Sequence, residues 1–228
     1  MNLAIIPARI GSKRIKNKNI IKVNNKPIIY YVIKKLIKCN LFDKIVVSTD
    51  SSKIIDISNR YGAQTPFLRP KNLSDDNTRA SKVVKHAIYW YKKKNINFKY
   101  VCCVYPTSLL LNVKYVRKAF QLLNKNKKKS YVITITEYNH PIQRAFTFKN
   151  NIIKTTWPDN IKKRTQDFQK YYHDAGQFYF GRSTAFENEI EPISNNSIPI
   201  ILEKDEVFDL DNYSDLKYIK KINLNNFI

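Results

Sequence analysis

The sequence predicts an α/β domain built on a mostly parallel sheet, and two features of the chain support that prediction. Short apolar runs typical of buried strands alternate with stretches in which apolar residues recur at helical spacing. The 228 residues contain no internal repeat and no linker rich in Pro, Gly or Ser, and this length suits one domain. We therefore expect a single domain over residues 1–228, with an insertion at about 137–172.

Regular elements are predicted along the first 136 residues. Strands are expected at residues 3–8, 44–49, 100–105 and 131–136, and helices at 27–38, 51–61, 80–93 and 113–123. Pro27 can begin the first of these helices, and Gly62 is a plausible cap at the end of the second. Strands and helices alternate throughout this part, as in a parallel sheet with crossover helices.

The pattern changes after residue 136. The pair Asn150-Asn151 favours a tight turn, so a hairpin is predicted over residues 145–156. Residues 157–172 are polar, aromatic and irregular. Regular structure is expected to return with strands at 177–180 and 198–202 and a closing helix at 213–222. The segment in between looks like an insertion or a lid.

The chain is strongly basic, with 41 Lys and Arg against 18 Asp and Glu and a net charge of +23. Three explanations fit this charge: a nucleic-acid partner, anionic small substrates, or a composition rich in Lys, Asn and Ile of the kind that A/T-rich codons produce. The basic residues are spread along the chain, and no known nucleic-acid-binding motif occurs. We therefore expect no nucleic-acid partner, and keep a basic nucleic-acid-binding protein as the alternative from a different class.

The three cysteines, Cys39, Cys102 and Cys103, are an odd number without a CxxC spacing. They make a poor disulfide framework and suggest a reducing compartment, which predicts a cytoplasmic location. The opening apolar run is too short for a signal peptide, and no run approaches the roughly 18 apolar residues of a membrane span. We expect no membrane partner.

Ligands of open α/β sheets bind at the carboxyl ends of the strands. After the first strand, five cations fall within ten residues: Arg9, Lys13, Arg14, Lys16 and Lys18. Gly11 would let backbone N–H groups turn towards a ligand. The loop matches neither GxGxxG nor GxxxxGK[ST], so it is neither a dinucleotide loop nor a P-loop. Either it binds the phosphates of a nucleotide or it is a solvated basic loop.

Three further strand ends carry polar residues. Asp50 follows the second strand, and Tyr105-Pro106-Thr107-Ser108 follows the third. Asp209 and Asp211 would point the same way from an extended backbone, and Mg²⁺ would relieve the repulsion between them. Each of these groups has a second interpretation as the N-cap of the helix that follows.

Taken together, these stretches resemble the CMP-sialic acid synthetases, the cytidylyltransferases for nine-carbon 2-keto acid sugars. The matching motifs are IIPARIGSKRIKNKN (5–19), VVSTD (46–50), FLRPKNLSDD (67–76), YPTS (105–108) and FDLD (208–211). The resemblance runs the full length of the chain. It implies a nucleotidyltransferase-type, Rossmann-like domain that transfers CMP from CTP to the anomeric hydroxyl of an acidic sugar and releases pyrophosphate.

The insertion resembles that of the pseudaminic acid branch of the family. The motifs are HPIQRA (140–145), RTQD (164–167) and YHDAGQFY (172–179). Sialate enzymes usually carry a lysine where Gln143 stands and an Asn-Gly pair near Asp174. Their Gln-Pro-Thr-Ser-Pro-Leu-Arg run begins here with Tyr105 and ends with Leu111. Pseudaminic acid is thus the implied sugar, with N-acetylneuraminate or legionaminate as alternatives and an eight-carbon Kdo enzyme as a further rival.

The resemblance also implies roles for individual residues. Those on the nucleotide side are Arg9, Ser12, Lys13, Lys18, Asn19, Arg69, Pro106 and Thr107, with Arg9 and Lys18 as catalytic cations and Arg69 reading cytosine. Those on the sugar side are Tyr105, Gln143, Arg144, Arg164, Gln177 and Tyr179, and Asp209 and Asp211 would hold Mg²⁺. It further implies a homodimer whose insertion reaches across the interface. The general base stays open, with His140 and His173 as candidates for sugar contacts.

Overall fold

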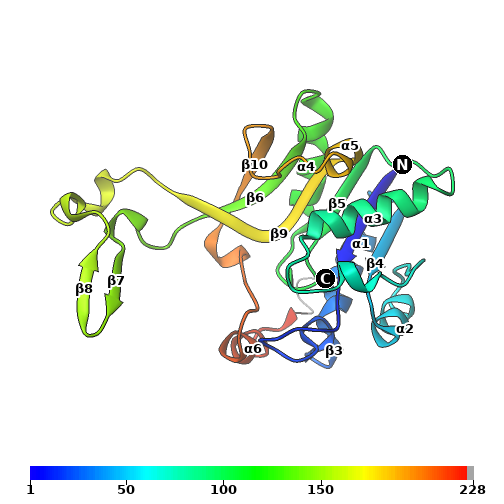
Figure 1. Cartoon of the computed structure of the whole chain (residues 1–228), viewed down its shortest axis with the longest axis horizontal. Helices are drawn as coiled ribbons and strands as arrows, with labels where there is room; N and C mark the ends of the chain where they lie inside the picture. Colours follow the sequence, from blue (N-terminus) through cyan, green and yellow to red (C-terminus); the bar gives the residue numbers. More distant parts are fainter. Residues whose placement is uncertain (225–228) are drawn as a thin grey trace.

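The computed structural model describes residues 1–224, and its centre is a six-stranded sheet with helices on both faces (Figure 1). The strand order is β10-β6-β9-β5-β1-β4. The strands are β1 (Asn2–Pro7), β4 (Lys44–Ser48), β5 (Tyr100–Val104), β6 (Tyr131–Glu137), β9 (Tyr172–Arg182) and β10 (Ser197–Leu202). The predicted α/β class with a mostly parallel sheet is confirmed. The last four residues of the predicted domain lie outside the described residues.

Alternation along the buried strands divides the core into two layers. In β1, Ala4 and Ile6 face a cluster that contains residues of α1 (Ile28–Cys39) and α4 (Val113–Lys125). The residues between them, Leu3 and Ile5, face a second cluster with α3 (Ala80–Lys92) and α5 (Ser183–Glu187). A strand whose side chains are buried on both faces requires an uninterrupted apolar run, and the sequence of β1 supplies it.

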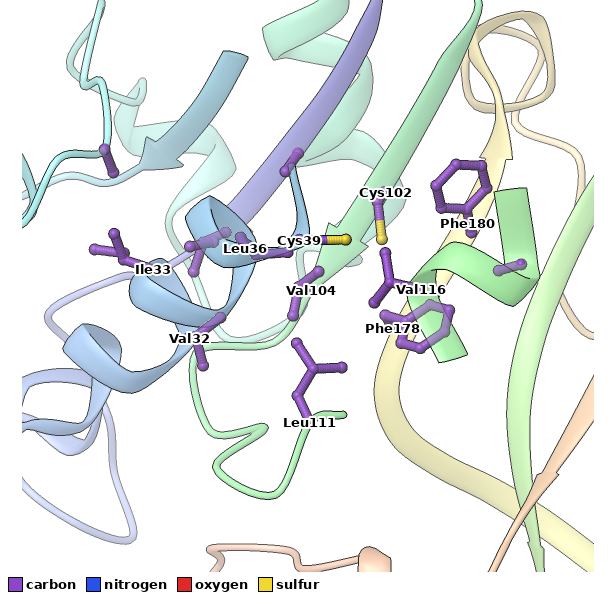
Figure 2. Packing of buried hydrophobic residues seen from close by; sticks show 14 of the residues in the cluster. Val32, Ile33, Leu36, Cys39, Cys102, Val104, Leu111, Val116, Phe178 and Phe180 are labelled. Atoms are coloured by element: carbon purple, nitrogen blue, oxygen red, sulfur yellow. The ribbon is translucent and has the colours of Figure 1, made fainter. Parts of the chain in front are cut away.

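The first layer packs α1 and α4 against β5 and β9. Figure 2 shows Leu36 of α1 and Val116 of α4 on either side of Cys102 and Val104, with Phe178 and Phe180 of β9 beside them. α2 (Ser52–Arg60) adds Ile54 to this cluster and ends before Gly62, whose φ is +99°. The predicted role of Gly62 in ending this helix therefore agrees with its left-handed backbone.

The three cysteines are free thiols buried inside these layers. Burial raises the pKa of the Cys103 thiol to about 12 and also raises that of Cys102. They behave as small apolar core residues. Within the described residues, no helix combines the length and the apolar character needed to cross a bilayer.

The structure contains a short antiparallel pair that was not predicted, β2 (Lys22–Val23) with β3 (Lys26–Pro27), and it departs from the predicted elements at three further places. β9 extends over eleven residues and runs antiparallel to both β5 and β6, with a register shift between Ile133 and Ile135 of β6. Its first residues are polar and exposed, so they show no strand pattern in the sequence. The five-residue helix α5 was not predicted, and α6 (Tyr213–Ile219) ends three residues earlier than expected.

Residues 138–171, between β6 and β9, leave the sheet as an arm that projects from the body of the molecule (Figure 1). Its hairpin pairs β7 (Phe146–Lys149) with β8 (Ile152–Thr155). Asn150 and Asn151 connect them with φ angles of 50° and 60°, which is the type I′ geometry expected of this pair. The predicted hairpin therefore forms, but it lies outside the main sheet.

Gly181 in β9 gives a test of how tightly the sheet is packed. A Cβ built at this position would lie 2.5 Å from two ring carbons of Tyr131 and 2.9 Å from Phe186. We expect Gly181→Ala to lower the free energy of unfolding by about 1–3 kcal/mol, because these rings are buried and must shift. Urea denaturation measures the change. Gly11→Ala is the control, since no atom lies within 4 Å of a Cβ there, and equal midpoints for the two variants would contradict the packing.

Candidate active site

The carboxyl ends of β1 and β5 border a cavity of about 560 Å³. Three segments distant in sequence line it: the loop after β1, the stretch that leads into α3, and the turn after β5. All eight residues expected on the nucleotide side are brought together here, namely Arg9, Ser12, Lys13, Lys18, Asn19, Arg69, Pro106 and Thr107. Tyr105 joins them from the expected sugar side.

The loop after β1 is held in place by backbone and side-chain hydrogen bonds. The Ala8 amide donates to the Ser48 carbonyl at 2.9 Å, and the Ile10 amide donates to the Asp50 carboxylate at 2.9 Å. Further along, the Asn19 side chain donates to the Arg9 carbonyl at 2.8 Å. Asp50 therefore holds this loop, and α2 receives no side-chain cap at its N-terminus, so the helix-cap interpretation of Asp50 is wrong.

Gly11 does not have the left-handed backbone that would turn its neighbours' N–H groups. Among the described glycines, positive φ occurs at Gly62 and Gly176. The left-handed residue of this loop is Asn17, with φ 55°. Gly11 has open space where a Cβ would lie, so the described structure does not require a glycine at this position.

Four of the five cations in the loop pair with two carboxylates from elsewhere in the chain. Asp76 forms ion pairs with Arg9 and with Lys13, the latter at 2.5 Å. Asp211 pairs with Arg14 at 2.8 Å and lies 3.5 Å from Lys18. The fifth cation, Lys16, is exposed and does not line the cavity. The ion pairs with Asp76 and Asp211 therefore fix the positions of these four positive charges.

Arg69 reaches the cavity from a buried position, with only 5% of its surface exposed. Its guanidinium donates to the Ser48 carbonyl at 2.9 Å and to the Leu73 carbonyl at 3.5 Å. Its Nε–H has no hydrogen-bond partner within the described part of the chain. Burial lowers the pKa of Arg69 but an arginine stays protonated, so a fixed cation borders the cavity.

His86 belongs to α3, and its ring lies 4.8 Å from that of Phe67. Burial and the charge of Arg69 lower the pKa of His86, so its imidazole is neutral at pH 7. His86 does not belong to the lining of the nucleotide cavity.

The turn after β5 is positioned by β9. The Tyr105 amide and the Ser108 hydroxyl both donate to the Gln177 carbonyl, at 3.1 and 2.9 Å. The helix that follows, α4, is capped instead by Asn112, which accepts from the Lys114 amide. The helix-cap interpretation of this turn is therefore wrong. The Gln177 side chain is buried beneath the turn and donates to the Glu206 carbonyl at 2.6 Å.

A second cavity of about 380 Å³ shares Tyr105 with the first. Tyr179 lies in its wall, with its ring 6.0 Å from that of Tyr105 and its hydroxyl donating to the Asp174 carboxylate. Burial raises the pKa of both tyrosines, so both hydroxyls stay protonated; the Tyr179 hydrogen is engaged by Asp174, which leaves the Tyr179 oxygen as an acceptor. Two of the residues expected on the sugar side thus lie next to the nucleotide cavity.

Three more residues expected on the sugar side, Gln143, Arg144 and Arg164, lie on the arm and line neither of these cavities. The Gln143 amide donates to the Gln169 carbonyl at 2.7 Å, and the Arg144 guanidinium lies 5.6 Å from the Phe168 ring centre. Within one chain, the structure therefore does not bring these three residues to the nucleotide cavity.

The expected histidines also lie at the arm. His140 and Arg144 line a hollow of about 420 Å³ on it. The ring of His173 packs 4.8 Å from that of Tyr138, where the arm leaves the sheet. Neither histidine lines the nucleotide cavity or the cavity that holds Tyr179.

The sequence Asp209-Leu210-Asp211 lies beside the loop cations, before α6. Burial raises the pKa of Asp209, and the negative charges of Asp211 and Asp174 raise it further. The cap of α6 is formed by Asn212 and Asp215, which complete a capping box, so the helix-cap interpretation of Asp211 is wrong.

The Asp209–Asp211 pair fits a hard divalent cation, because such a cation would relieve both the desolvation and the repulsion of the carboxylates. In the described residues, no cluster of three or more His, Cys, Asp or Glu side chains is arranged to hold a metal. A metal bound by this pair would therefore need further oxygen ligands from substrate or water.

Two residues at the cavity were not singled out from the sequence. Asp75 and Asp76 both line it, and they end the motif FLRPKNLSDD, from which only Arg69 was assigned a role. The signal was present as two adjacent carboxylates in a strongly basic chain. Their contact with the loop after β1 depends on the fold and could not be predicted from spacing.

A family model described as cytidylyltransferase matches residues 3–228, and the chain belongs to the cytidylyltransferase family. Within it, the chain is 41% identical to the pseudaminic acid cytidylyltransferase of Campylobacter jejuni, over 96% of this chain and 94% of that one. It is also 26% identical to a CMP-N,N'-diacetyllegionaminic acid synthase of Legionella pneumophila, over 96% of this chain and 95% of that one.

Solved structures confirm the nucleotidyltransferase type of the fold. A CMP:2-keto-3-deoxy-manno-octonic acid synthetase complexed with CTP superposes with a TM-score of 0.73 at 12% identity, covering 99% of both chains. A 4-diphosphocytidyl-2C-methyl-D-erythritol synthase gives a TM-score of 0.67 at 10% identity, with 96% of both chains covered. At these identities, the likeness concerns the fold alone.

Proposed function

We propose that this chain transfers CMP from CTP to the anomeric hydroxyl of pseudaminic acid, giving a CMP-sugar and pyrophosphate. The observation that carries the proposal is the single cavity in which the loop cations Arg9, Lys13 and Lys18 face the buried guanidinium of Arg69. Such a cavity suits a phosphate chain at one end and a base with hydrogen-bonding edges at the other. The identity of 41% to a pseudaminic acid cytidylyltransferase supports this sugar over its relatives.

In the proposed reaction, the anomeric oxygen of the sugar forms a bond to the α-phosphorus of CTP. The bond from that phosphorus to the β-phosphate bridge breaks, and pyrophosphate leaves with the electron pair. Negative charge grows on the phosphate oxygens, so catalysis depends on positioning and on fixed positive charge. Arg9 and Lys18 supply that charge from a loop whose backbone is fixed by Asp50 and Asn19.

Arg69 is proposed to orient the cytosine, because its guanidinium lines the cavity and is held in place by two backbone carbonyls. Mg²⁺ is proposed to bind Asp209 and Asp211, where it would offset the charge of the phosphates when bound. Ser12 and Asn19 are proposed to complete the phosphate side, and Pro106 and Thr107 the nucleoside side, since all four line the same cavity.

The sugar is proposed to lie towards Tyr105 and Tyr179, with the Tyr105 hydroxyl as a donor and the Tyr179 oxygen as an acceptor. Gln177 supports this wall from below through its carbonyl. Gln143, Arg144 and Arg164 would have to come from a second copy of the chain, because the arm carries them away from the chain's own cavity. We therefore propose a homodimer in which each arm completes the partner's sugar site.

Apolar side chains on the hairpin support this dimer. Phe146 and Phe148 are 58% and 67% exposed, and Ile152 and Ile153 are 68% and 62% exposed. Adjacent large apolar residues at such exposure are typical of an interaction surface. The three free, buried cysteines agree with a cytoplasmic location, and the proposal includes neither a nucleic-acid nor a membrane partner.

We expect Phe148→Asp to convert the protein to a monomer that still binds CTP but has lost sugar turnover, because a charge in the apolar contact opposes its burial. Light scattering after size exclusion, with CTP titration, measures both properties. Tyr89→Asp is the matched control, because Tyr89 is exposed on α3, outside the arm. A monomeric wild-type protein with full turnover would contradict the dimer.

The proposed reaction is tested by incubating the protein with CTP, Mg²⁺ and pseudaminic acid and following the products by mass spectrometry. A CMP-sugar is expected, together with one pyrophosphate for each CTP consumed. UTP in place of CTP should give far less product, since Arg69 is fixed for one base edge. No product from folded protein, or equal use of UTP, would contradict the proposal.

A further inference from the structure

The contact between Asp76 and two of the loop cations suggests a role beyond the proposed reaction. We infer that Asp76 competes with nucleotide phosphates for Arg9 and Lys13. This competition weakens the binding of phosphate by the two cations and promotes the release of pyrophosphate. This inference rests on the proposed function of the cavity as a triphosphate site. Asp76 has no role in that proposed reaction.

Asp76 contacts the two cations through separate oxygens. Its Oδ1 pairs with Nη2 of Arg9, and its Oδ2 lies 2.5 Å from Nζ of Lys13. Those nitrogens are the donors that a phosphate at this place would need. All three residues line the same cavity, so a carboxylate and a phosphate oxygen would compete for the same N–H groups.

The ion pairs are not needed to hold the cations in the fold. The side chain of Lys13 is 83% exposed, and that of Asp76 is 32% exposed. Exposed pairs of this kind add little to stability. Their effect should therefore appear in anion binding, where the same charges meet a ligand. The two cations hold the pKa of Asp76 below its usual range, so it stays ionised and available at neutral pH.

The surrounding turn allows the carboxylate to withdraw without unfolding the loop. Asp75 closes the turn by accepting from the amides of Asn77 and Thr78, at 2.9 and 2.7 Å. Before it, the Ser74 hydroxyl donates to the Pro70 carbonyl at 3.0 Å. The backbone on both sides of Asp76 is thus fixed by contacts that do not involve Asp76. A change of its side-chain rotamer alone breaks or restores both ion pairs.

Asp76 differs in this respect from Asp211, the other carboxylate that pairs with the loop. Asp211 contacts Arg14 and Lys18, and it belongs to the proposed metal pair. A metal bound there would arrive with the nucleotide and favour its phosphates. In the described residues, Asp76 is the carboxylate that forms ion pairs with Arg9 and Lys13, while Oδ1 of Asp75 accepts from the turn. Its effect on a phosphate is therefore repulsive.

The inference is tested with Asp76→Asn, which keeps the shape of the side chain and removes its charge. Binding of pyrophosphate, CTP and cytidine is measured by calorimetry without Mg²⁺. We expect Kd for pyrophosphate and CTP to fall about three- to tenfold, the range of one or two exposed ion pairs, and Kd for cytidine to stay constant. Pyrophosphate should also inhibit the variant at a correspondingly lower concentration.

Glu189→Gln is the matched control, because it removes the same charge from an exposed pair with Lys85 away from the cavity. Thermal denaturation establishes that both variants are folded. Unchanged or weaker pyrophosphate binding in Asp76→Asn would overturn the inference, and so would equal tightening of cytidine. If the wild-type protein binds no CTP at all, the proposed function itself fails. Wild-type CTP binding that is insensitive to Asp76→Asn rejects the role of Asp76 alone.

Discussion

Arg9→Ala is expected to lower kcat by about a hundredfold or more while the fold stays intact, because it removes a fixed charge from the proposed transition state. Arg9 lines the cavity, and its side chain is 30% exposed, so it is not part of the core. Its carbonyl accepts from Asn19, and this backbone contact survives the substitution. Initial rates of pyrophosphate release at saturating CTP and sugar measure the effect.

Lys16→Ala is the control for this experiment. Lys16 belongs to the same loop and carries the same charge, but it is exposed and lies outside the cavity lining. We expect its kcat to stay close to that of the wild type. Near-normal turnover in a folded Arg9→Ala protein, or equal losses of kcat in both variants, would contradict the catalytic role of Arg9. The loop would then act only as a general source of positive charge.

Asp209→Asn and Asp211→Asn should each raise the Mg²⁺ concentration needed for half-maximal activity by about tenfold or more, since each removes one ionised ligand. Burial and the charge of Asp211 raise the pKa of Asp209, so protons compete with the metal at a higher pH than for an ordinary carboxyl group. Apparent Mg²⁺ affinity in the wild type should therefore fall as the pH drops towards this raised pKa. Titrations at several pH values measure both effects.

The two variants are expected to differ in CTP binding without metal. Asp211→Asn also frees Arg14 and Lys18 from their carboxylate, so metal-free CTP should bind it more tightly than it binds Asp209→Asn. Asp205→Asn is the control, because Asp205 is an exposed carboxylate in the same segment. Mg²⁺ titrations that match the wild type in both variants would show that this pair holds no metal.

The buried strands and the amphipathic helices could be predicted because their patterns are local. The apolar run of β1 and the helical stripe of α1 each indicate their own structure, and the buried layers follow from them. β9 could not be bounded in this way. Its first residues are exposed and polar, and they are strand only because β6 pairs with them.

For a different reason, the sequence could not decide whether Asp50 and Asp211 cap a helix or contact other groups. Asp50 and Asp211 both precede helices, and a cap interpretation fits that spacing equally well. In the structure, the Ile10 amide donates to the Asp50 carboxylate. Asn212 and Asp215 cap α6 in place of Asp211. The first contact joins residues far apart in the chain. The second depends on which of two adjacent side chains accepts the hydrogen bonds of the helix end.

The candidate site was predictable in part on its nucleotide side, because the loop after β1 and the turn after β5 follow strands that end at one edge of the sheet. The motif that carries Arg69 follows a helix, and only the family resemblance assigned it. The sugar side was less predictable from the sequence. Gln143, Arg144 and Arg164 lie on an arm whose position relative to a cavity depends on a second chain in the proposed dimer. Asp76 was missed because its contact with Arg9 joins two loops that only the fold brings together.

The central claim is tested most directly by pyrophosphate release with CTP and Mg²⁺ across four acids: pseudaminic, legionaminic, N-acetylneuraminic and Kdo. We predict that kcat/KM for pseudaminic acid exceeds that for each of the others by about a hundredfold or more, as expected where a site's polar groups match one substrate. A higher value for another acid would contradict the assigned sugar and leave the cytidylyl transfer standing. No release with any of the four would contradict the assignment of the nucleotide cavity itself.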